Sequence, residues 1–160
     1  MDRILFGGGC FWGVENAFGQ VEGVTDVVSG YSGGHVENPS YEQVCTGSTD
    51  HAEVVEVSFD PARVTVEQLL DLFWKIHDPT QINRQGPDIG SQYRSVIFCT
   101  TDAQLAAARA SKQALEESGR FPYPIVTEIA AAGAFWPAEE HHQHYFEKLG
   151  VSPTCHGGGQ

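Results

Sequence analysis

The feature that most constrains the fold of this chain is the succession of two different residue periodicities. Residues 52–59 alternate in the manner of a half-buried strand, whereas the segment after Thr65 places its apolar residues on one face of a helix. Segments of the two kinds mix without a strict strand–helix–strand repeat. We therefore expect an α+β fold, a two-layer domain with a mixed, mostly antiparallel sheet and helices packed on it.

Most elements can be assigned from these patterns and from the turn residues beside them. Strands are expected at residues 3–6, 24–31, 52–59, 95–100 and 125–129, and helices at residues 11–20, from Thr65 to the Asp78-Pro79 pair, and at residues 101–118 and 138–149. Thr65 and Thr101 each stand three residues before a glutamine, which is the spacing of a capping box. Residues 41–45 are ambiguous, and residues 80–92 are expected to form a long polar loop, a kind of segment that often has a functional role.

Length and composition indicate a single folded domain. The chain has 160 residues, of which 41% are hydrophobic and 19% are charged, which suits one domain with a full hydrophobic core. We assign this domain to residues 1–149. Residues 150–160 are rich in glycine and are expected to form a flexible C-terminal tail.

Charge and hydropathy exclude several classes of partner. The net charge of −12 repels phosphate backbones, so we expect no binding to nucleic acid. No apolar run approaches the ~20 residues of a membrane helix, and residues 1–6 are too short for the apolar region of a signal peptide, which needs roughly 7–15 residues. We therefore expect a cytoplasmic protein without membrane association, and a monomer, because no interface is evident in the sequence.

The strongest local signal for chemistry is the run Gly7-Gly8-Gly9-Cys10-Phe11-Trp12-Gly13. Here a predicted strand leads through three glycines into a cysteine at the first turn of a predicted helix. The free N–H groups and the positive dipole end of a helix N-terminus stabilise a thiolate, which is the nucleophilic form of cysteine. Two aromatic residues beside it can build an apolar pocket. The alternative is that Cys10 is a small buried apolar residue.

The other cysteines and a histidine cluster show no metal-binding or disulfide pattern. The chain contains four cysteines at wide, irregular spacings without a CxxC pair, which excludes a zinc knuckle and a thioredoxin-type motif. Cys45 and Cys99 have apolar neighbours and are expected to be buried and unreactive. His141 and His144 are one helical turn apart, but no partner set with metal spacing exists elsewhere, so we expect no metal site.

Three separated motifs resemble those of the A-type peptide methionine sulfoxide reductases. They are Gly-Cys-Phe-Trp-Gly at residues 9–13, His51-Ala52-Glu53, and Asp-Ile-Gly-Ser-Gln-Tyr-Arg-Ser at residues 88–95. The resemblance extends from Phe6 to about Leu149. It implies that residues 1–149 are the catalytic domain of a methionine-S-sulfoxide reductase that repairs oxidised proteins. It also implies that the enzyme needs no bound cofactor and is recycled by an external dithiol such as thioredoxin.

The resemblance assigns the reacting groups to three residues. Cys10 would attack the sulfoxide sulfur and be left as a sulfenic acid. Glu53 would donate the proton that the leaving oxygen needs, and an apolar aromatic environment suits a carboxyl group with that role. Cys155, in the glycine-rich tail, would then form a disulfide with Cys10 that thioredoxin reopens. Cys45 is an alternative resolving thiol because it lies near Tyr41 in the sequence.

The resemblance also assigns the groups that hold the substrate. Tyr41 and Tyr93 would bond the sulfoxide oxygen, and Asp88 would hold the backbone amide of the substrate. Phe11 and Trp12 would surround the methyl group and so select the S epimer. Without the resemblance, the two tyrosines would be interpreted as core or rim residues and Asp88 as a turn residue. Glu53 would likewise be interpreted as a surface residue of an alternating strand.

Two other functional classes remain open from the sequence. Cys10 could be the nucleophile of a hydrolase with His51 as its base and the helix start as its oxyanion site. Cys10 and Cys155 could instead form the switch of a thiol redox sensor, which would need neither Glu53 nor the tyrosine hydroxyls. Turnover of a sulfoxide substrate distinguishes the reductase from the sensor.

Overall fold

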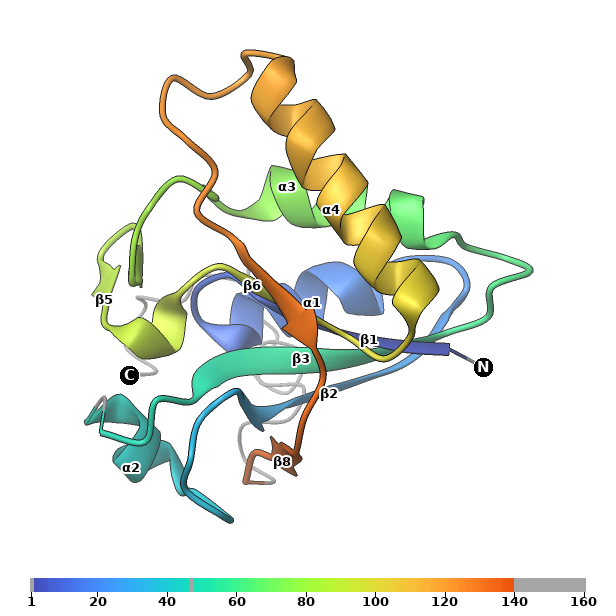
Figure 1. Ribbon diagram of the computed structural model, residues 1–160. Helices are drawn as coiled ribbons and strands as arrows, with labels where there is room; N and C mark the ends of the chain where they lie inside the picture. Colours follow the sequence, from blue (N-terminus) through green and yellow to red (C-terminus); the bar gives the residue numbers. More distant parts are fainter. Residues whose placement is uncertain (1, 47, 140–160) are drawn as a thin grey trace.

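The computed structural model describes residues 2–46 and 48–139, and it forms an α+β fold around one six-stranded sheet (Figure 1). The order of the strands across the sheet is β7-β6-β1-β3-β2-β8, and only the β6–β7 pair is parallel. These strands are β1 (Asp2–Gly7), β2 (Val24–Ser32), β3 (Ala52–Phe59), β6 (Val96–Cys99), β7 (Glu128–Ala131) and β8 (Phe135–Pro137). The mixed, mostly antiparallel sheet confirms the predicted fold class.

In the described part of the chain, four α-helices accompany the sheet: α1 (Phe11–Gly19), α2 (Tyr41–Cys45), α3 (Val66–Ile76) and α4 (Asp102–Glu117). Thr65 caps α3 in the predicted capping box with Gln68. Thr101 caps α4 alone, because the side chain of Gln104 accepts a hydrogen bond from the Thr100 backbone instead, so the predicted box is wrong there. No helix in residues 2–46 and 48–139 is long and apolar enough to cross a membrane.

The two faces of the sheet are covered differently. On one face, Val55, Val57 and Phe59 belong to the main core, which also contains the apolar residues of α1, α3 and α4. On the other face, Ala52 and Val54 belong to a smaller cluster that residues 130–135 cover. The prediction that β3 is half-buried is therefore wrong, since most of its residues on both faces are buried. This double burial gives β3 a solvent-excluded position at the centre of the sheet.

Several segments differ from the sequence-based expectation. The polar segment 80–92 contains a small hairpin of β4 (Arg84–Gln85) and β5 (Asp88–Ile89) and the start of the 3-10 helix η1 (Ser91–Tyr93). Residues 41–45, which were ambiguous, form α2, and the predicted strand at residues 125–129 begins only at Glu128.

The end of the described chain differs most. Strand β8 was not predicted, and it pairs with β2 as an edge strand, a position that tolerates Pro137. The backbone N–H of Ala138 still bonds to β2, at the carbonyl of Ser29, so the predicted helix does not begin at Ala138. The remainder of that predicted helix, the histidine pair within it and the tail at residues 150–160 lie outside the described residues.

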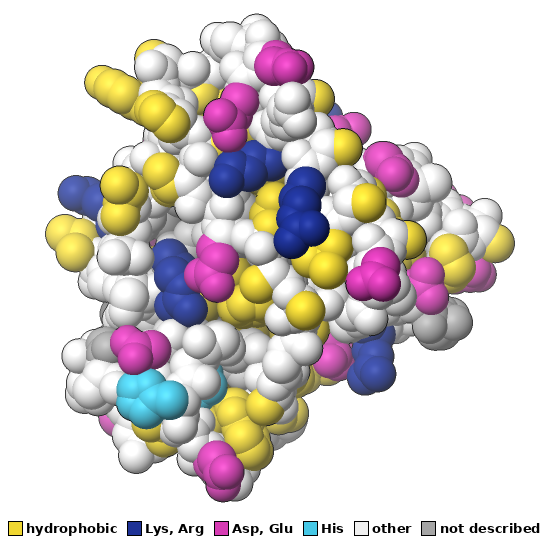
Figure 2. Space-filling view, in the orientation of Figure 1, with side chains coloured by type: hydrophobic (Ala, Val, Ile, Leu, Met, Phe, Trp, Pro, Cys, Tyr) yellow, Lys and Arg dark blue, Asp and Glu magenta, His cyan; other side chains and the backbone are white. Residues whose placement is uncertain are grey.

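On the face drawn in Figure 2, acidic and basic side chains are interspersed and do not gather into one patch. The net charge of −12 is therefore not concentrated in a single acidic surface on that face.

Candidate active site

Three glycines bring the end of β1 into close contact with its neighbours and turn the chain into α1. A Cβ atom on Gly7 would lie 2.9 Å from the carbonyl oxygen of Glu53, and one on Gly8 would lie 2.9 Å from Cγ of His77. Gly9 has a φ of 98°, a conformation that favours glycine. The turn ends at Cys10, which is the N-cap of α1 and is only 2% exposed. The sequence thus places this thiol at a helix N-terminus, as predicted.

Glu53 lies beside the same helix end. It is fully buried on β3, and its Oε1 accepts a hydrogen bond of 3.2 Å from the backbone N–H of Phe11. The carboxyl group and the thiol of Cys10 are therefore both placed at the first turn of α1. The interpretation of Glu53 as a surface residue is wrong, and the strand pattern itself explains why. Glu53 has the same parity as Val55, so it points to the face of the sheet that the helices cover.

An aromatic wall adjoins these two groups. Phe11 and Trp12 are buried, and the half-buried ring of Tyr41 stacks on both of them, with centroid distances of 6.2 Å to Phe11 and 6.4 Å to Trp12. Tyr31 from β2 packs against Phe11 at 5.6 Å. The first turn of α1 is therefore enclosed by apolar rings from β2 and α2, which is the kind of environment that the predicted methyl pocket requires.

Two tyrosine hydroxyls lie within electrostatic range of the buried carboxyl group. Burial first and the charge of Glu53 second raise the pKa of Tyr41 and of Tyr93 well above the ordinary tyrosine range. Asp88 and Cys10 also raise the pKa of Tyr93, so this hydroxyl lies near both. Both hydroxyls therefore stay protonated at neutral pH and can donate hydrogen bonds. The structure thus groups Cys10 with most of the predicted site residues, namely Phe11, Trp12, Tyr41, Glu53, Asp88 and Tyr93.

Comparison with known proteins identifies this arrangement. The family model of the peptide methionine sulfoxide reductases matches residues 2–157 of this chain. The chain belongs to this family. A peptide methionine sulfoxide reductase MsrA of Methanoculleus marisnigri is 60% identical over 150 residues, which are 94% of this chain and 92% of the relative.

Solved structures agree with this family. Mxr1 from Saccharomyces cerevisiae in reduced form has a TM-score of 0.89 and 37% identity, covering 96% of this chain and 88% of that one. Mxr1 in complex with Trx2 has a TM-score of 0.63 and 27% identity, covering 89% and 83% of the two chains. Membership makes this chain a peptide-methionine (S)-S-oxide reductase, which reduces methionine sulfoxide to methionine.

The geometry of His51 also argues against the hydrolase alternative. In the reductase this side chain is 2% exposed, and both of its ring nitrogens have partners. Nδ1 accepts a hydrogen bond of 2.9 Å from the backbone N–H of Gly34, so Nε2 carries the proton that it donates to the carbonyl of Val36 at 2.6 Å. Because the ring stabilises the loop before β3, it is not available as a base for Cys10.

The remaining cysteines differ in their surroundings. Cys99 is 2% exposed, and burial raises the pKa of its thiol to about 11, as expected for an unreactive group. Cys45 was predicted to be buried, and this is wrong, because it lies exposed at the last position of the one-turn helix α2. The pKa of the Cys45 thiol is nevertheless raised, mainly because neighbouring groups shield it from water, although a hydrogen bond with the side chain of Tyr41 acts in the opposite direction. Cys155 lies outside the described residues.

Two residues near the site were missed at the sequence level. The hydroxyl of Tyr31, which is fully buried, donates a hydrogen bond of 3.2 Å to Oε1 of Glu139. Oε2 of the same carboxylate accepts a bond of 3.2 Å from the backbone N–H of Tyr41. Tyr31 pairs with Glu53 across the β2–β3 ladder, so the strand register would have revealed it. No sequence signal pointed to Glu139, which was assigned to a helix.

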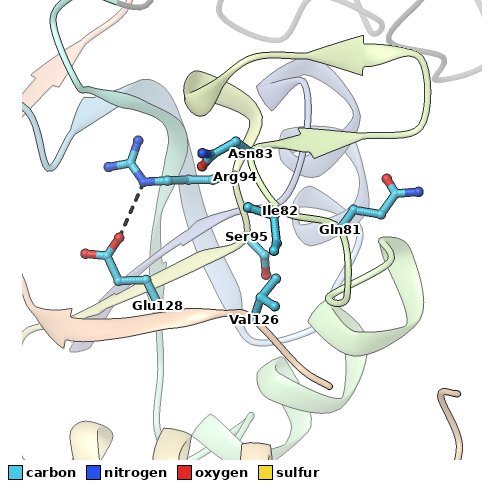
Figure 3. A pocket seen from close by; sticks show the side chains of 7 residues that line it. All are labelled: Gln81, Ile82, Asn83, Arg94, Ser95, Val126 and Glu128. Atoms are coloured by element: carbon cyan, nitrogen blue, oxygen red, sulfur yellow. Dashed lines mark hydrogen bonds and ion pairs between the residues drawn. The ribbon is translucent and has the colours of Figure 1, made fainter. Parts of the chain in front are cut away.

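A separate surface pocket of about 160 Å³ lies near β7 (Figure 3). Its charged groups pair with each other, since Nε of Arg94 lies 3.4 Å from Oε1 of Glu128. The pocket contains none of the predicted site residues, and its lining consists of Gln81, Ile82, Asn83, Arg94, Ser95, Val126 and Glu128. In residues 2–46 and 48–139 no group of three histidine, cysteine or acidic side chains could hold a metal ion.

Proposed function

We propose that this reductase uses Cys10 as its nucleophile and Glu53 as its acid, and that it acts on the S epimer of methionine sulfoxide. One observation supports this most strongly: the fully buried carboxyl group of Glu53 bonds to the backbone N–H of the residue that follows Cys10. A general acid must lie within reach of the reacting atoms, and burial favours the protonated form that can donate.

The reaction transfers one oxygen atom between two sulfur atoms. The thiolate of Cys10 attacks the sulfoxide sulfur, while Glu53 donates a proton to the sulfoxide oxygen. The attack forms a bond between the two sulfur atoms. This bond and the sulfur–oxygen bond of the substrate then break as the protonated oxygen forms its bond to the sulfur of Cys10, which is left as a sulfenic acid. The substrate gains two electrons and leaves as methionine, and Cys10 is oxidised by the same two electrons.

Substrate recognition follows from the groups around Cys10. The rings of Phe11 and Trp12 would surround the methyl group, and the hydroxyls of Tyr41 and Tyr93 would donate to the sulfoxide oxygen. In the R epimer the methyl group and the oxygen exchange places. The methyl group would then face the hydroxyls and the oxygen would face the apolar rings, so only the S epimer fits. Asp88 would accept a hydrogen bond from the backbone amide of the substrate, which favours methionine sulfoxide within a polypeptide.

Recycling requires a second thiol. The thiol of Cys155 would attack the sulfur of the Cys10 sulfenic acid, so that a disulfide forms and the oxygen leaves as water. The dithiol of a thioredoxin would then reduce this disulfide and become oxidised itself. The complex of yeast Mxr1 with Trx2 supports this choice of partner. A cytoplasmic location suits the scheme, because that compartment keeps dithiols reduced. Oxidised proteins would be the substrates, and no bound cofactor is needed.

The test is turnover of the separate S and R epimers of a blocked methionine sulfoxide, with dithiothreitol as reductant. We expect turnover of the S epimer alone, and none by the Cys10→Ser variant. The matched control is Cys99→Ser, because the buried thiol of Cys99 lies outside the site and its loss should leave turnover unchanged. Activity of Cys10→Ser, or equal turnover of both epimers, would overturn the proposal.

A further inference from the structure

Glu139 connects three parts of the molecule at the active site. It follows the edge strand β8, and its two carboxylate oxygens accept separate hydrogen bonds from the Tyr31 hydroxyl on β2 and from the Tyr41 backbone at the start of α2. Two such donors favour the ionised form of a carboxyl group. Glu139 is only partly exposed, so water screens its charge incompletely.

The two carboxyl groups of the site act on the same phenol. Burial raises the pKa of Tyr31 most, and the next contributions come from Glu139 and then from Glu53. Glu53 lies within electrostatic range of Tyr31 on β2, of Tyr41 and Cys45 on α2, and of Tyr93 on η1. Glu139 lies within range of two of the same groups, Tyr31 and Cys45. Cys10, at the start of α1, and Asp88, on β5, lie within range of Tyr93.

Opposing effects decide the protonation of Glu53. The Phe11 N–H and the positive end of α1 favour its ionised form. Complete burial and a neighbouring negative charge favour its protonated form. A general acid must hold its proton when the substrate arrives, so the helix N-terminus works against the proposed role of Glu53. A second carboxylate close by offsets the helix.

We propose that Glu139 is a positioning residue of the reductase, whose carboxylate fixes Tyr41 and Tyr31 and whose negative charge keeps Glu53 protonated. This inference rests on the proposed role of Glu53 as the acid. It assigns to Glu139 two separable effects, one through hydrogen bonds and one through charge.

Two substitutions separate these effects. Glu139→Gln removes the charge but can keep both hydrogen bonds, because the amide oxygen can accept from the Tyr41 N–H and the amide N–H₂ can donate to the Tyr31 oxygen. Glu139→Ala removes both. Glu117→Gln is the matched control. Glu117 is exposed on α4, which packs against β6 and β7, at the opposite edge of the sheet from β8. Its carboxylate accepts a hydrogen bond of 3.4 Å from the side chain of Gln113.

The measurement is the rate of the first turnover of the S-sulfoxide, followed as methionine formed without a recycling reductant, between pH 5 and pH 10. Deprotonation of Glu53 should produce an alkaline limb in the wild-type profile. In Glu139→Gln this limb should move to lower pH by about one unit, because the loss of a nearby negative charge makes deprotonation of Glu53 easier. Glu139→Ala should show the same shift with a raised KM, and Glu117→Gln should match the wild type.

The outcomes separate this inference from the proposed function. A Glu139→Gln profile with its alkaline limb at the wild-type pH would overturn the role of Glu139 while leaving the acid role of Glu53 in place. A wild-type profile without an alkaline limb would also overturn the proposed role of Glu139. An unchanged rate and profile in Glu53→Gln would instead refute the acid itself. Because Glu139→Gln keeps the hydrogen bonds, the test does not depend on whether Glu139→Ala folds.

Discussion

The buried side chain of His77 packs under the glycine turn before Cys10. Its protonation should make the stability of the reductase sensitive to mild acid. This side chain ends α3, is 8% exposed and lies directly under Gly8. Its Nδ1 donates to the carbonyl of Phe73 at 2.6 Å, so in the neutral ring Nε2 accepts from the hydroxyl of Ser95 at 2.8 Å. Burial lowers the pKa of His77 from 6.5 to about 4, although the Phe73 carbonyl and Asp78 act in the opposite direction.

The lowered pKa of His77 sets the sign and size of the effect. Between pH 6.5 and pH 4 the unfolded chain binds a proton that the folded chain does not, so stability falls as the pH falls through this window. The full difference corresponds to about 3 kcal/mol, since one pKa unit equals about 1.4 kcal/mol. About 2 kcal/mol of this should be lost between pH 7 and pH 5.

The assay is urea unfolding at pH 7, 6 and 5 for the wild type and for His77→Asn, whose amide can still donate to the Phe73 carbonyl. Carboxyl groups titrate in both proteins, so the difference between the two pH slopes isolates His77. The variant should be less stable at pH 7 but should lose about 2 kcal/mol less on going to pH 5. Parallel slopes for the two proteins would refute the neutral, buried state of His77.

Three further substitutions test the site and its support. Glu53→Gln should slow the first turnover at neutral pH by about 10²-fold or more, while the KM for the sulfoxide changes little. Cys155→Ser should complete one turnover and then stop with thioredoxin as reductant; sustained turnover would move the resolving role to Cys45. Gly8→Ala should lower the free energy of unfolding by about 1–3 kcal/mol, because its Cβ would overlap the ring of His77, and the urea midpoint reports this directly.

Helix caps and turns were predictable from the sequence because the residues that form them lie close together in the chain. The bond from Gln68 to Thr65 spans three residues, and the turn from β1 into α1 needs only the glycines beside it. These features depend on backbone geometry that neighbouring residues set. The strand β8 was missed because its identity depends on pairing with β2, more than a hundred residues earlier. Nothing within the edge-strand segment itself distinguishes it from a loop.

Burial was harder to predict than secondary structure. The apolar neighbours of Cys45 suggested a buried thiol, but the fully buried residue of the short helix α2 is Val44, and Cys45 lies exposed at its end. Glu53 shows the reverse error. Its charge suggested the surface, although the alternation of β3 already placed it on the covered face with Val55. A residue's type predicted its exposure less well than its position in the strand did.

The position of Glu53 also indicates why the site needs so many elements. A buried carboxyl group costs free energy unless neighbouring groups bond to it. Here α1 supplies an N–H group, and β2, α2 and η1 supply the phenols that surround it. Of these phenols, Tyr31 is placed by the sheet register, which sets it directly opposite Glu53 on the neighbouring strand. A shift of β2 by one residue would turn Tyr31 to the opposite face and remove it from Phe11 and Glu139. The surroundings of Glu53, and with them the chemistry proposed at Cys10, therefore depend on the register of β2 against β3.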